Sequence, residues 1–308
     1  MGWAIDDIPD QRGRIAVVTG ANSGLGFEAS RELARKQATV VMAVRDLAKG
    51  EAAAKRIRAD VPESALEPRT LDLGSLESVR AFASRLAEEH DHVDILLNNA
   101  GLMATPAGLT SDGFETQVGT NHFGHFVLTE ELMPLLEAAP AARIVTMTSG
   151  ARMQGHTLSD DSARVGDDYD PWQAYGDSKL ANYQFGVELA RRLAAAGSSV
   201  SSLVAHPGLA HTNLQVATVE NAGTGLSGRF WKVAARYIGM PPLAGALPGL
   251  RAATDPSAKN GEFYGPRWVA RGAPVRLGPD EKRAAATETA RMWSISEELT
   301  GTVFDVGS

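Results

Sequence analysis

The sequence predicts an α/β fold built on a doubly wound parallel sheet with helices on both faces. Short apolar runs rich in Val, Ile and Leu alternate with longer amphipathic stretches from residue 14 to about residue 205. Strands that are apolar almost throughout are typical of parallel sheets buried on both sides. The regular alternation of strand and helix indicates right-handed crossovers between parallel neighbours. A glycine-rich turn also follows the first expected strand.

The expected elements follow one another without a linker that would divide the chain. The expected strands are residues 14–20, 38–44, 66–73, 93–99, 143–149 and 199–208. The expected helices are residues 27–37, 47–59 and 75–90, with one more before each of the last two strands. Residues 261–266 form either an edge strand or a packed segment. We therefore expect a single domain over residues 1–308, with its core in residues 14–205.

Residues 209–250 break the alternation. They carry several Gly and Pro residues and one short apolar helix, residues 230–238. Because open α/β sheets bind ligands at the carboxyl ends of their strands, a segment that follows the last core strand can cover that edge. We expect a small substrate lid here. The alternative is a packed surface excursion with no role in binding.

The composition limits the partners and the compartment of the protein. The 308 residues carry a net charge of −7 with a pI near 5.6, which argues against nucleic acid as a partner. The chain has no cysteine, so disulfides, thiolate nucleophiles and Cys-ligated zinc are excluded. Its first residues are acidic and polar, and no apolar run reaches the roughly 18 residues of a membrane span. We expect a soluble, cytoplasmic protein without a membrane partner.

The turn TGANSGLG, residues 19–26, is the first candidate binding site. Gly20, Gly24 and Gly26 permit a tight turn and a close approach of the backbone to a pyrophosphate. The helix that follows directs its N-terminal amides at that anion. The spacing differs from the Gly-x-Gly-x-x-Gly of most dinucleotide folds, and glycines also serve as plain turn residues. The position directly after an apolar strand favours a Rossmann-type dinucleotide site.

Arg45 follows the second expected strand, where NAD-binding enzymes usually carry a carboxylate for the ribose 2′-hydroxyl. A guanidinium instead suits a 2′-phosphate, which it can bind with two hydrogen bonds. The alternative is a solvated arginine paired with the adjacent Asp46. The sequence therefore predicts NADP(H) as the cofactor.

Tyr175 and Lys179 lie four residues apart in an expected helix, so their side chains share one face. A phenol that titrates near 10 becomes a useful acid or base when a nearby cation lowers its pKa. Ser149 ends a central strand, where its hydroxyl can bond a substrate oxygen. Each feature also has a plain structural explanation: an amphipathic helix, or an N-cap serine. For NNAG (98–101) and Asn121, the structural explanation is that side-chain amides form hydrogen bonds with backbone groups at bends.

Together these motifs resemble the short-chain dehydrogenase/reductase family, in that family's order, from residue 14 to the C-terminus. The ordered set is TGANSGLG, Asp72, NNAG, Asn121, Ser149, YGDSK (175–179) and HPG (206–208). The chain is also similar to the retinol-dehydrogenase-like branch, which mostly uses NADP(H). That similarity lies in AVRDLAKGE (43–51), TNHFGHFVLT (120–129), RMWSISEELTG (291–301) and the long gap between Ser149 and Tyr175.

The resemblance implies a role for each matched residue. Tyr175 would exchange a proton with the substrate oxygen, Ser149 would hold that oxygen, and Lys179 would bind the nicotinamide ribose and lower the pKa of the tyrosine. Asn121 would connect Lys179 to a proton-relaying water. The catalytic set is thus Asn121, Ser149, Tyr175 and Lys179. The cofactor-binding set is Gly20, Asn22, Ser23, Gly24, Leu25, Gly26, Arg45, Asp72, Leu73, Asn98, Ala100, Gly101, Tyr175, Lys179, Pro207, Gly208 and Thr212.

The expected reaction is hydride transfer between NADP(H) and a carbonyl/alcohol pair, in particular reduction of an apolar or bulky ketone or aldehyde. The apolar lid motivates this substrate class. The candidate lining residues are Met153, Trp172, Leu209 and His211. No metal is expected, because hydrogen bonds and the cofactor's charge polarise the substrate. The alternative function is a non-catalytic NADP(H)-binding redox sensor. Reduction of an activated carbon–carbon double bond is remote, since the chain lacks the cysteine that the resemblance implies for it.

Two departures limit what the resemblance implies. Membrane-bound members of the branch carry an N-terminal apolar anchor, which this sequence does not show. Residues 150–174 and 209–245 match least, so the retinoid substrate is not carried over. Family members often pair through the helices that hold Asn121 and Tyr175. The expected state is therefore a homodimer or homotetramer, although the branch also contains monomers.

Overall fold

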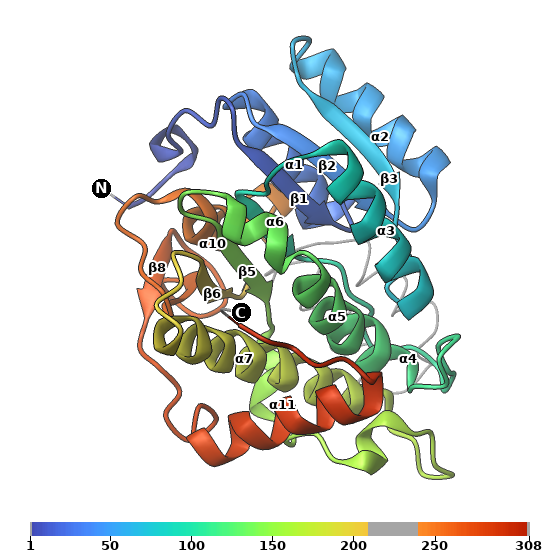
Figure 1. Ribbon diagram of the computed structural model, residues 1–308. Helices are drawn as coiled ribbons and strands as arrows, with labels where there is room; N and C mark the ends of the chain where they lie inside the picture. Colours follow the sequence, from blue (N-terminus) through green and yellow to red (C-terminus); the bar gives the residue numbers. More distant parts are fainter. Residues whose placement is uncertain (1, 209–239, 307–308) are drawn as a thin grey trace.

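The computed structural model describes residues 2–208 and 240–306, arranged around one eight-stranded sheet (Figure 1). The strands are β1 Ile15–Thr19, β2 Thr39–Val44, β3 Leu66–Thr70, β4 Ile95–Asn98, β5 Arg143–Met147, β6 Ser201–Ala205, β7 Phe263–Pro266 and β8 Pro274–Leu277. Their order is β3-β2-β1-β4-β5-β6-β7-β8, and only the pair β7–β8 is antiparallel. The order reverses between β1 and β4, so the sheet is doubly wound as predicted.

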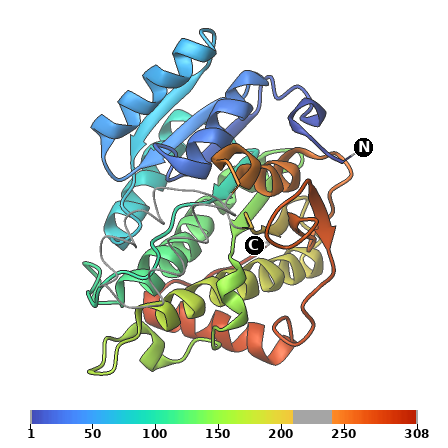
Figure 2. The same cartoon turned by 180° about the vertical axis from the view of Figure 1, so that it is seen from behind.

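Helices cover both faces of the sheet. They are α1 Gly24–Arg35, α2 Leu47–Asp60, α3 Leu76–Glu89, α4 Thr116–Val118, α5 Gly124–Glu131, α6 Met133–Ala138, α7 Pro171–Ala195, α10 Pro242–Thr254 and α11 Ala286–Thr300. Short turns of other helical types are η1 Ile5–Asp7, η2 Gly119–Phe123, η3 Gly150–Met153 and η4 Asp160–Ala163. Helices α1, α2 and α10 pack on one face and α3, α5 and α7 on the other (Figures 1 and 2). Helix α11 lies along α7.

Strand residues alternate between two apolar cores, which explains why the central strands β1, β2 and β4 are apolar almost throughout. Within β1, Val17 belongs to the core under α3, α5 and α7, whereas Ala16 and Val18 belong to the core under α1, α2 and α10. All three are fully buried. Because consecutive strand side chains point to opposite faces, a strand covered on both sides needs an apolar residue at every position.

The C-terminal part of the sheet extends further than the sequence indicates. Residues 261–266 contribute β7, which is an inner strand rather than an edge strand, because β8 pairs along its outer side. β8 itself was not predicted. It is a four-residue strand that begins with Pro274 and carries the exposed Arg276, so it lacks the apolar run of the buried strands.

The expected lid, residues 209–250, falls mostly outside the described residues. The final part of that interval, residues 242–250, begins α10, which packs on the sheet and fully buries Leu250. These last residues thus belong to the core and do not cover the site. Within the two described ranges, no helix has both the length and the apolar character needed to cross a membrane.

Candidate active site

The turn between β1 and α1 packs so closely that two of its positions require glycine. Gly20 has a φ of +68°, in the left-handed region that side chains disfavour. A Cβ on Gly26 would lie 2.4 Å from the Gly20 carbonyl oxygen and 2.6 Å from the side-chain nitrogen of Asn99. The first turn of α1 therefore lies directly against the end of β1, which is the packing that a pyrophosphate-binding turn needs.

Thr19 and Asn99 hold this turn, although the sequence analysis selected neither. The Thr19 hydroxyl accepts hydrogen bonds from the amides of Asn99 and Ala100, both at 2.9 Å, and the Asn99 side chain donates to the Thr19 carbonyl at 2.8 Å. His125 connects the same hydroxyl to the Asn121 carbonyl through its two ring nitrogens, each at 2.9 Å. Asn99 lies inside the NNAG motif, which was predicted to bind the cofactor through the neighbouring residues Asn98, Ala100 and Gly101.

The N-terminus of α1 is the part of the site that fits a pyrophosphate. Ser23 is the N-cap of this 12-residue helix, and its side chain makes no capping hydrogen bond. The half-buried residues of the turn are Asn22, Ser23, Gly24 and Leu25. Uncapped amides and the positive end of the helix dipole favour an anion at this position. The glycine turn therefore fits the diphosphate of a dinucleotide.

Arg45 lies exposed just after β2, next to the glycine turn. Within the described ranges its guanidinium has no hydrogen-bond or ion-pair partner. Asp46 is the N-cap of α2, where it accepts from the Lys49 amide at 3.1 Å and pairs with the Lys49 ammonium at 3.5 Å. Asp46 therefore pairs with Lys49, and the alternative in which it pairs with Arg45 is not observed.

The half-buried residues after β3 and β4 lie at the same end of the sheet as the glycine turn. Asp72 accepts from the Gly74 amide at 2.9 Å, which fixes its carboxylate in a tight turn. Ala100 lies against the glycine turn, because a Cβ on Gly20 would be 3.1 Å from it. Gly101 follows directly. These positions are compatible with the adenosine-side contacts that the resemblance implies.

Leu73, which follows β3, and Asn98, which ends β4, are both buried. The Asn98 amide donates to the Thr129 hydroxyl on α5 at 3.0 Å. The carbonyl of Leu73 packs against α5, since a Cβ on Gly124 would lie only 2.3 Å from that oxygen. Both residues thus contact α5, and the Asn99 side chain reaches the glycine turn; cofactor contacts of Leu73 and Asn98 stay predictions.

Tyr175, Ser149 and Lys179 come together at the carboxyl end of β5. Lys179 Nζ lies 5.9 Å from the centre of the Tyr175 ring, and the Ser149 hydroxyl is near enough to the Tyr175 phenol to act on its pKa. Tyr175 is 7% exposed and Lys179 is 5% exposed. The Thr148 hydroxyl donates to the Lys179 carbonyl at 2.6 Å and fixes α7 to the end of β5. The fold thus collects the three side chains in one largely buried site.

Burial dominates the electrostatics of this site. It raises the pKa of Tyr175, while the hydrogen bond with Ser149 acts in the opposite direction. Burial also lowers the pKa of Lys179 to about 8. Burial is the larger of the two effects on Tyr175, and the lowering of its pKa by Lys179 stays a prediction.

Lys179→Met should raise the stability of the protein at neutral pH. The pKa of Lys179 falls from 10.5 to about 8 on folding, so between these values the unfolded chain binds more protons than the folded chain. The unfolding free energy of the wild type should consequently rise with pH through this window. We expect the variant's Tm to exceed that of the wild type at pH 7, with the difference shrinking toward pH 10 in thermal melts without cofactor. If the difference in Tm between the variant and the wild type did not change with pH, the lowered pKa of Lys179 in the folded protein would be contradicted.

Asn121 lies in the π-helical turn η2, a local irregularity that recurs at functional sites. Its side chain accepts from the Leu102 amide at 2.6 Å and donates to the Leu102 carbonyl and the Ser178 hydroxyl, both at 2.9 Å. A Cβ on Gly101 would lie 3.1 Å from both Asn121 Oδ1 and Lys179 Nζ. The two predicted residues therefore flank Gly101 together. The water relay between them stays a prediction.

Met153 and Trp172 lie on the two segments that flank Tyr175. Met153 ends η3 and is 53% exposed, whereas the half-buried Trp172 places its ring edge-on to the Tyr175 ring, with centres 6.4 Å apart. Pro207 and Gly208 follow β6 and are half-buried. The predicted residues Leu209, His211 and Thr212 lie outside the described residues, as does the apolar helix expected at 230–238.

His122, His125 and His206 belong to the protein interior. Burial lowers the pKa of His122 to about 3 and the pKa values of His125 and His206 to about 4. His122 Nε2 lies 2.8 Å from the Ser296 hydroxyl of α11. These histidines are thus neutral packing and hydrogen-bonding residues at physiological pH.

One group of side chains in the described part of the chain could ligate a metal ion: Glu67, Glu89 and His90. Arg69 already pairs with the two carboxylates, at 3.2 and 2.7 Å. The group lies near the start of β3, whereas Tyr175 lies at the carboxyl ends of the strands. It therefore takes no part in the candidate active site.

The comparison with known sequences identifies the family. A sequence model of the family described as short chain dehydrogenase matches residues 14–223. Human retinol dehydrogenase 13 is 39% identical over 291 residues, covering 94% of this chain and 85% of the relative. Mouse retinol dehydrogenase 12 is 38% identical over 299 residues, covering 94% and 87%. The chain belongs to the short-chain dehydrogenase family of oxidoreductases. Within that family it is similar to the retinol dehydrogenases.

Solved structures show the same architecture. An uncharacterized protein from Mycobacterium paratuberculosis has a TM-score of 0.81 and 42% identity, covering 99% of this chain and 100% of that chain. An NAD(P)-dependent gluconate 5-dehydrogenase from Beutenbergia cavernae, with bound NADP at low occupancy, has a TM-score of 0.65 and 26% identity, covering 82% and 95%. The mostly parallel, helix-covered sheet is thus the fold shared with these proteins.

Proposed function

We propose that this protein transfers hydride between NADP(H) and a carbonyl/alcohol pair, and that it reduces an apolar or bulky ketone or aldehyde. The observation that carries the proposal is the convergence of Tyr175, Ser149 and Lys179 in one largely buried site, with Lys179 one helical turn from Tyr175. The glycine turn fits the diphosphate of a dinucleotide, as argued above. When bound, the reduced nicotinamide supplies the hydride.

The side chains of this site suit the reductive direction. Burial raises the pKa of Tyr175, so its phenol is protonated at neutral pH and can give that proton to a carbonyl oxygen. The Ser149 oxygen accepts from the Ala151 amide at 3.2 Å, which leaves its proton free to hold the same substrate oxygen. Lys179, with a pKa of about 8, is mainly charged at pH 7 and stabilises negative charge that develops beside it.

The guanidinium of Arg45, which has no partner among the described residues, supports NADP(H) over NAD(H). It lies at the end of β2 beside the glycine turn, and the neighbouring carboxylate of Asp46 is engaged by Lys49. A solved relative with 26% identity also holds NADP. A cation in this position stabilises a 2′-phosphate and gives a 2′-hydroxyl little advantage.

Arg45→Asp should therefore change the cofactor preference. Loss of charge-assisted hydrogen bonds to a phosphate costs about 1.5–3 kcal/mol, or roughly 10- to 150-fold. We expect kcat/KM for NADPH to fall by about that factor while kcat/KM for NADH falls little or rises. Arg271→Asp, at another exposed arginine, serves as the matched control for net charge. Equal losses with both cofactors in the Arg45 variant would count against a 2′-phosphate contact.

Two observations support an apolar substrate. Trp172 packs edge-on against Tyr175, and Met153 presents exposed apolar surface at the end of the turn that begins at Ser149. The curated relatives at 38–39% identity are named for retinol, which is an apolar alcohol. The substrate itself, the cytoplasmic location and the homo-oligomeric state stay predictions.

The decisive assay follows the absorbance of NADPH and NADH in parallel with small and bulky aldehydes and ketones. Turnover of a bulky carbonyl with NADPH supports the proposal in full. A preference for NADH would refute the cofactor assignment. Binding of cofactor without turnover of any carbonyl would favour the redox-sensor alternative.

A further inference from the structure

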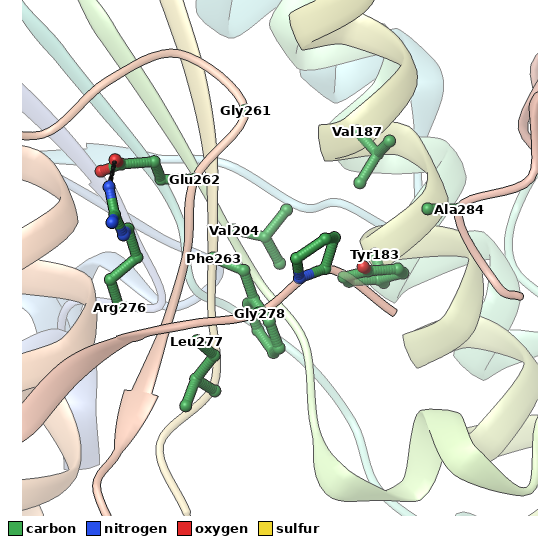
Figure 3. A pocket seen from close by; sticks show the side chains of 11 residues that line it. Tyr183, Val187, Val204, Gly261, Glu262, Phe263, Arg276, Leu277, Gly278 and Ala284 are labelled. Atoms are coloured by element: carbon green, nitrogen blue, oxygen red, sulfur yellow. Dashed lines mark hydrogen bonds and ion pairs between the residues drawn. The ribbon is translucent and has the colours of Figure 1, made fainter. Parts of the chain in front are cut away.

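A strap formed by residues 278–284 connects β8 to α11 and runs past α7. A pocket of about 540 Å³ lies between this strap, β7 and α7 (Figure 3). Its wall is mainly apolar and includes Tyr183 and Val187 of α7, Phe263 of β7, and Pro279 and Ala284 of the strap. The pocket is lined by the two ends of the strap, and Ala284 also packs against the apolar cluster that contains Tyr183 and Phe263. The middle of the strap is held by polar bonds.

The strap is attached to α7 by two hydrogen bonds. The amide of Asp280 donates to the Tyr183 hydroxyl at 2.9 Å, and the carbonyl of Arg283 accepts from the Gln184 amide group at 3.3 Å. Asp280 also pairs with the Arg283 guanidinium at 3.4 Å. The strap thus presents the guanidinium of Arg283 in a fixed orientation.

That guanidinium binds the turn that follows Ser149. Arg283 Nε donates to the Arg152 carbonyl at 3.2 Å, and Arg283 Nη2 donates to the Met153 carbonyl. Arg152 in turn donates from Nη1 to the Ser149 carbonyl at 3.3 Å. The Arg152 guanidinium lies over the rings of Tyr183 and Phe263, 5.3 and 4.9 Å from their centres. Two arginines therefore hold three carbonyls at the two ends of η3.

The position of η3 determines where the Ser149 hydroxyl points. Ser149 is the N-cap of η3, and its oxygen accepts from the Ala151 amide inside the turn at 3.2 Å. A single 3₁₀ turn has poor hydrogen-bond geometry and little stability of its own. If η3 shifts, Ser149 loses this bond and its alignment with Tyr175, and a misplacement of about 1 Å can cost about 10²-fold in rate.

We propose that Arg283 is a positioning residue for the reaction, which holds η3 from outside so that the Ser149 hydroxyl meets Tyr175. Arg283 contacts neither of these two side chains and acts only through the backbone of residues 152 and 153. The inference rests on the proposed function for its catalytic consequence. The mechanical part, that Arg283 immobilises η3, stands on the hydrogen bonds alone.

The test compares the full-length wild type with Arg283→Ala, Arg283→Lys and the control Arg276→Ala. Arg276 lines the same pocket and pairs with Glu262, but it does not touch η3. Hydrogen exchange by mass spectrometry should show residues 149–155 exchanging at least about tenfold faster in Arg283→Ala, with other segments unchanged. With a small carbonyl that does not reach Met153, kcat should fall about tenfold while KM and the Kd of NADPH stay within twofold. Arg283→Lys, which offers a cation without the planar fork, should lie between the wild type and Arg283→Ala.

The outcomes separate the two proposals. Faster exchange with unchanged kcat would overturn the positioning role, and unchanged exchange would overturn the claim that Arg283 holds η3. A rise in KM with constant kcat would also overturn the positioning role, because it marks a contribution to substrate binding. A uniform rise in exchange over the chain with a lower Tm would overturn it too, because it marks a contribution to overall stability. If the wild type turns over no carbonyl, the proposed function fails, while the exchange measurement still decides whether Arg283 holds the turn.

Discussion

Tyr175→Phe is expected to lower kcat by about 10²–10⁴-fold, the contribution of a positioned acid or base, and to leave the affinity for NADPH within about twofold. The ring of Tyr175 is 7% exposed and packs against Trp172, so phenylalanine keeps this packing. Only the hydroxyl that meets Ser149 is lost. Stopped-flow or steady-state turnover and cofactor titration by fluorescence would measure the two quantities on one preparation.

Tyr264→Phe is the matched control for this variant. Tyr264 of β7 is 2% exposed, and its hydroxyl donates to the carboxylate of Glu262, just before that strand. It should keep turnover close to that of the wild type. Turnover near the wild-type rate in Tyr175→Phe would show that another group moves the proton, and loss of NADPH affinity in that variant would show that the hydroxyl organises the cofactor site instead.

Gly26→Ala should weaken NADPH binding by at least about tenfold and lower the Tm by several degrees. The added methyl would lie 2.4 Å from the Gly20 carbonyl and 2.6 Å from the Asn99 side chain, and both are fixed by the fold. Forcing a methyl into such a site costs about 1–3 kcal/mol, so α1 must move away from β1. Its N-terminal amides then no longer converge on the diphosphate. Calorimetric titration and thermal melts would measure both effects.

Gly278→Ala is the control, because a Cβ there meets no atom within 4 Å. It should bind NADPH and melt like the wild type. Normal NADPH binding by a destabilised Gly26→Ala variant would place the dinucleotide somewhere other than the α1 N-terminus.

Much of the fold could be predicted because burial on both faces leaves a clear sequence signal. β1, β2 and β4 are nearly continuous apolar runs, and the predicted positions of β1 to β6 agree with the structure to within a few residues at each end. β8 gave no such signal. Its residues Pro274 and Arg276 are untypical of a buried strand, and only its pairing with β7 makes it a strand.

The site was predictable to the extent that motifs mark it. Parallel strands end at one edge of the sheet, so the glycine turn, Ser149 and Tyr175 had to lie near one another once the fold was assigned. The sign of the pKa shift of Tyr175 was not predictable, because it depends on how completely neighbouring segments exclude water. The contact of Arg283 with η3 was equally hidden, since only the path of the strap brings the two segments together.

The position of α11 has a consequence for self-association. Trp293 of α11 and Phe304 after it are almost fully buried against Phe126 of α5 and Phe185 of α7. These are the two helices through which the family resemblance implied pairing. The chain thus supplies from within itself the apolar layer that a second subunit would otherwise bring to this flank. We therefore predict that a homodimer or homotetramer of this protein would use a different face.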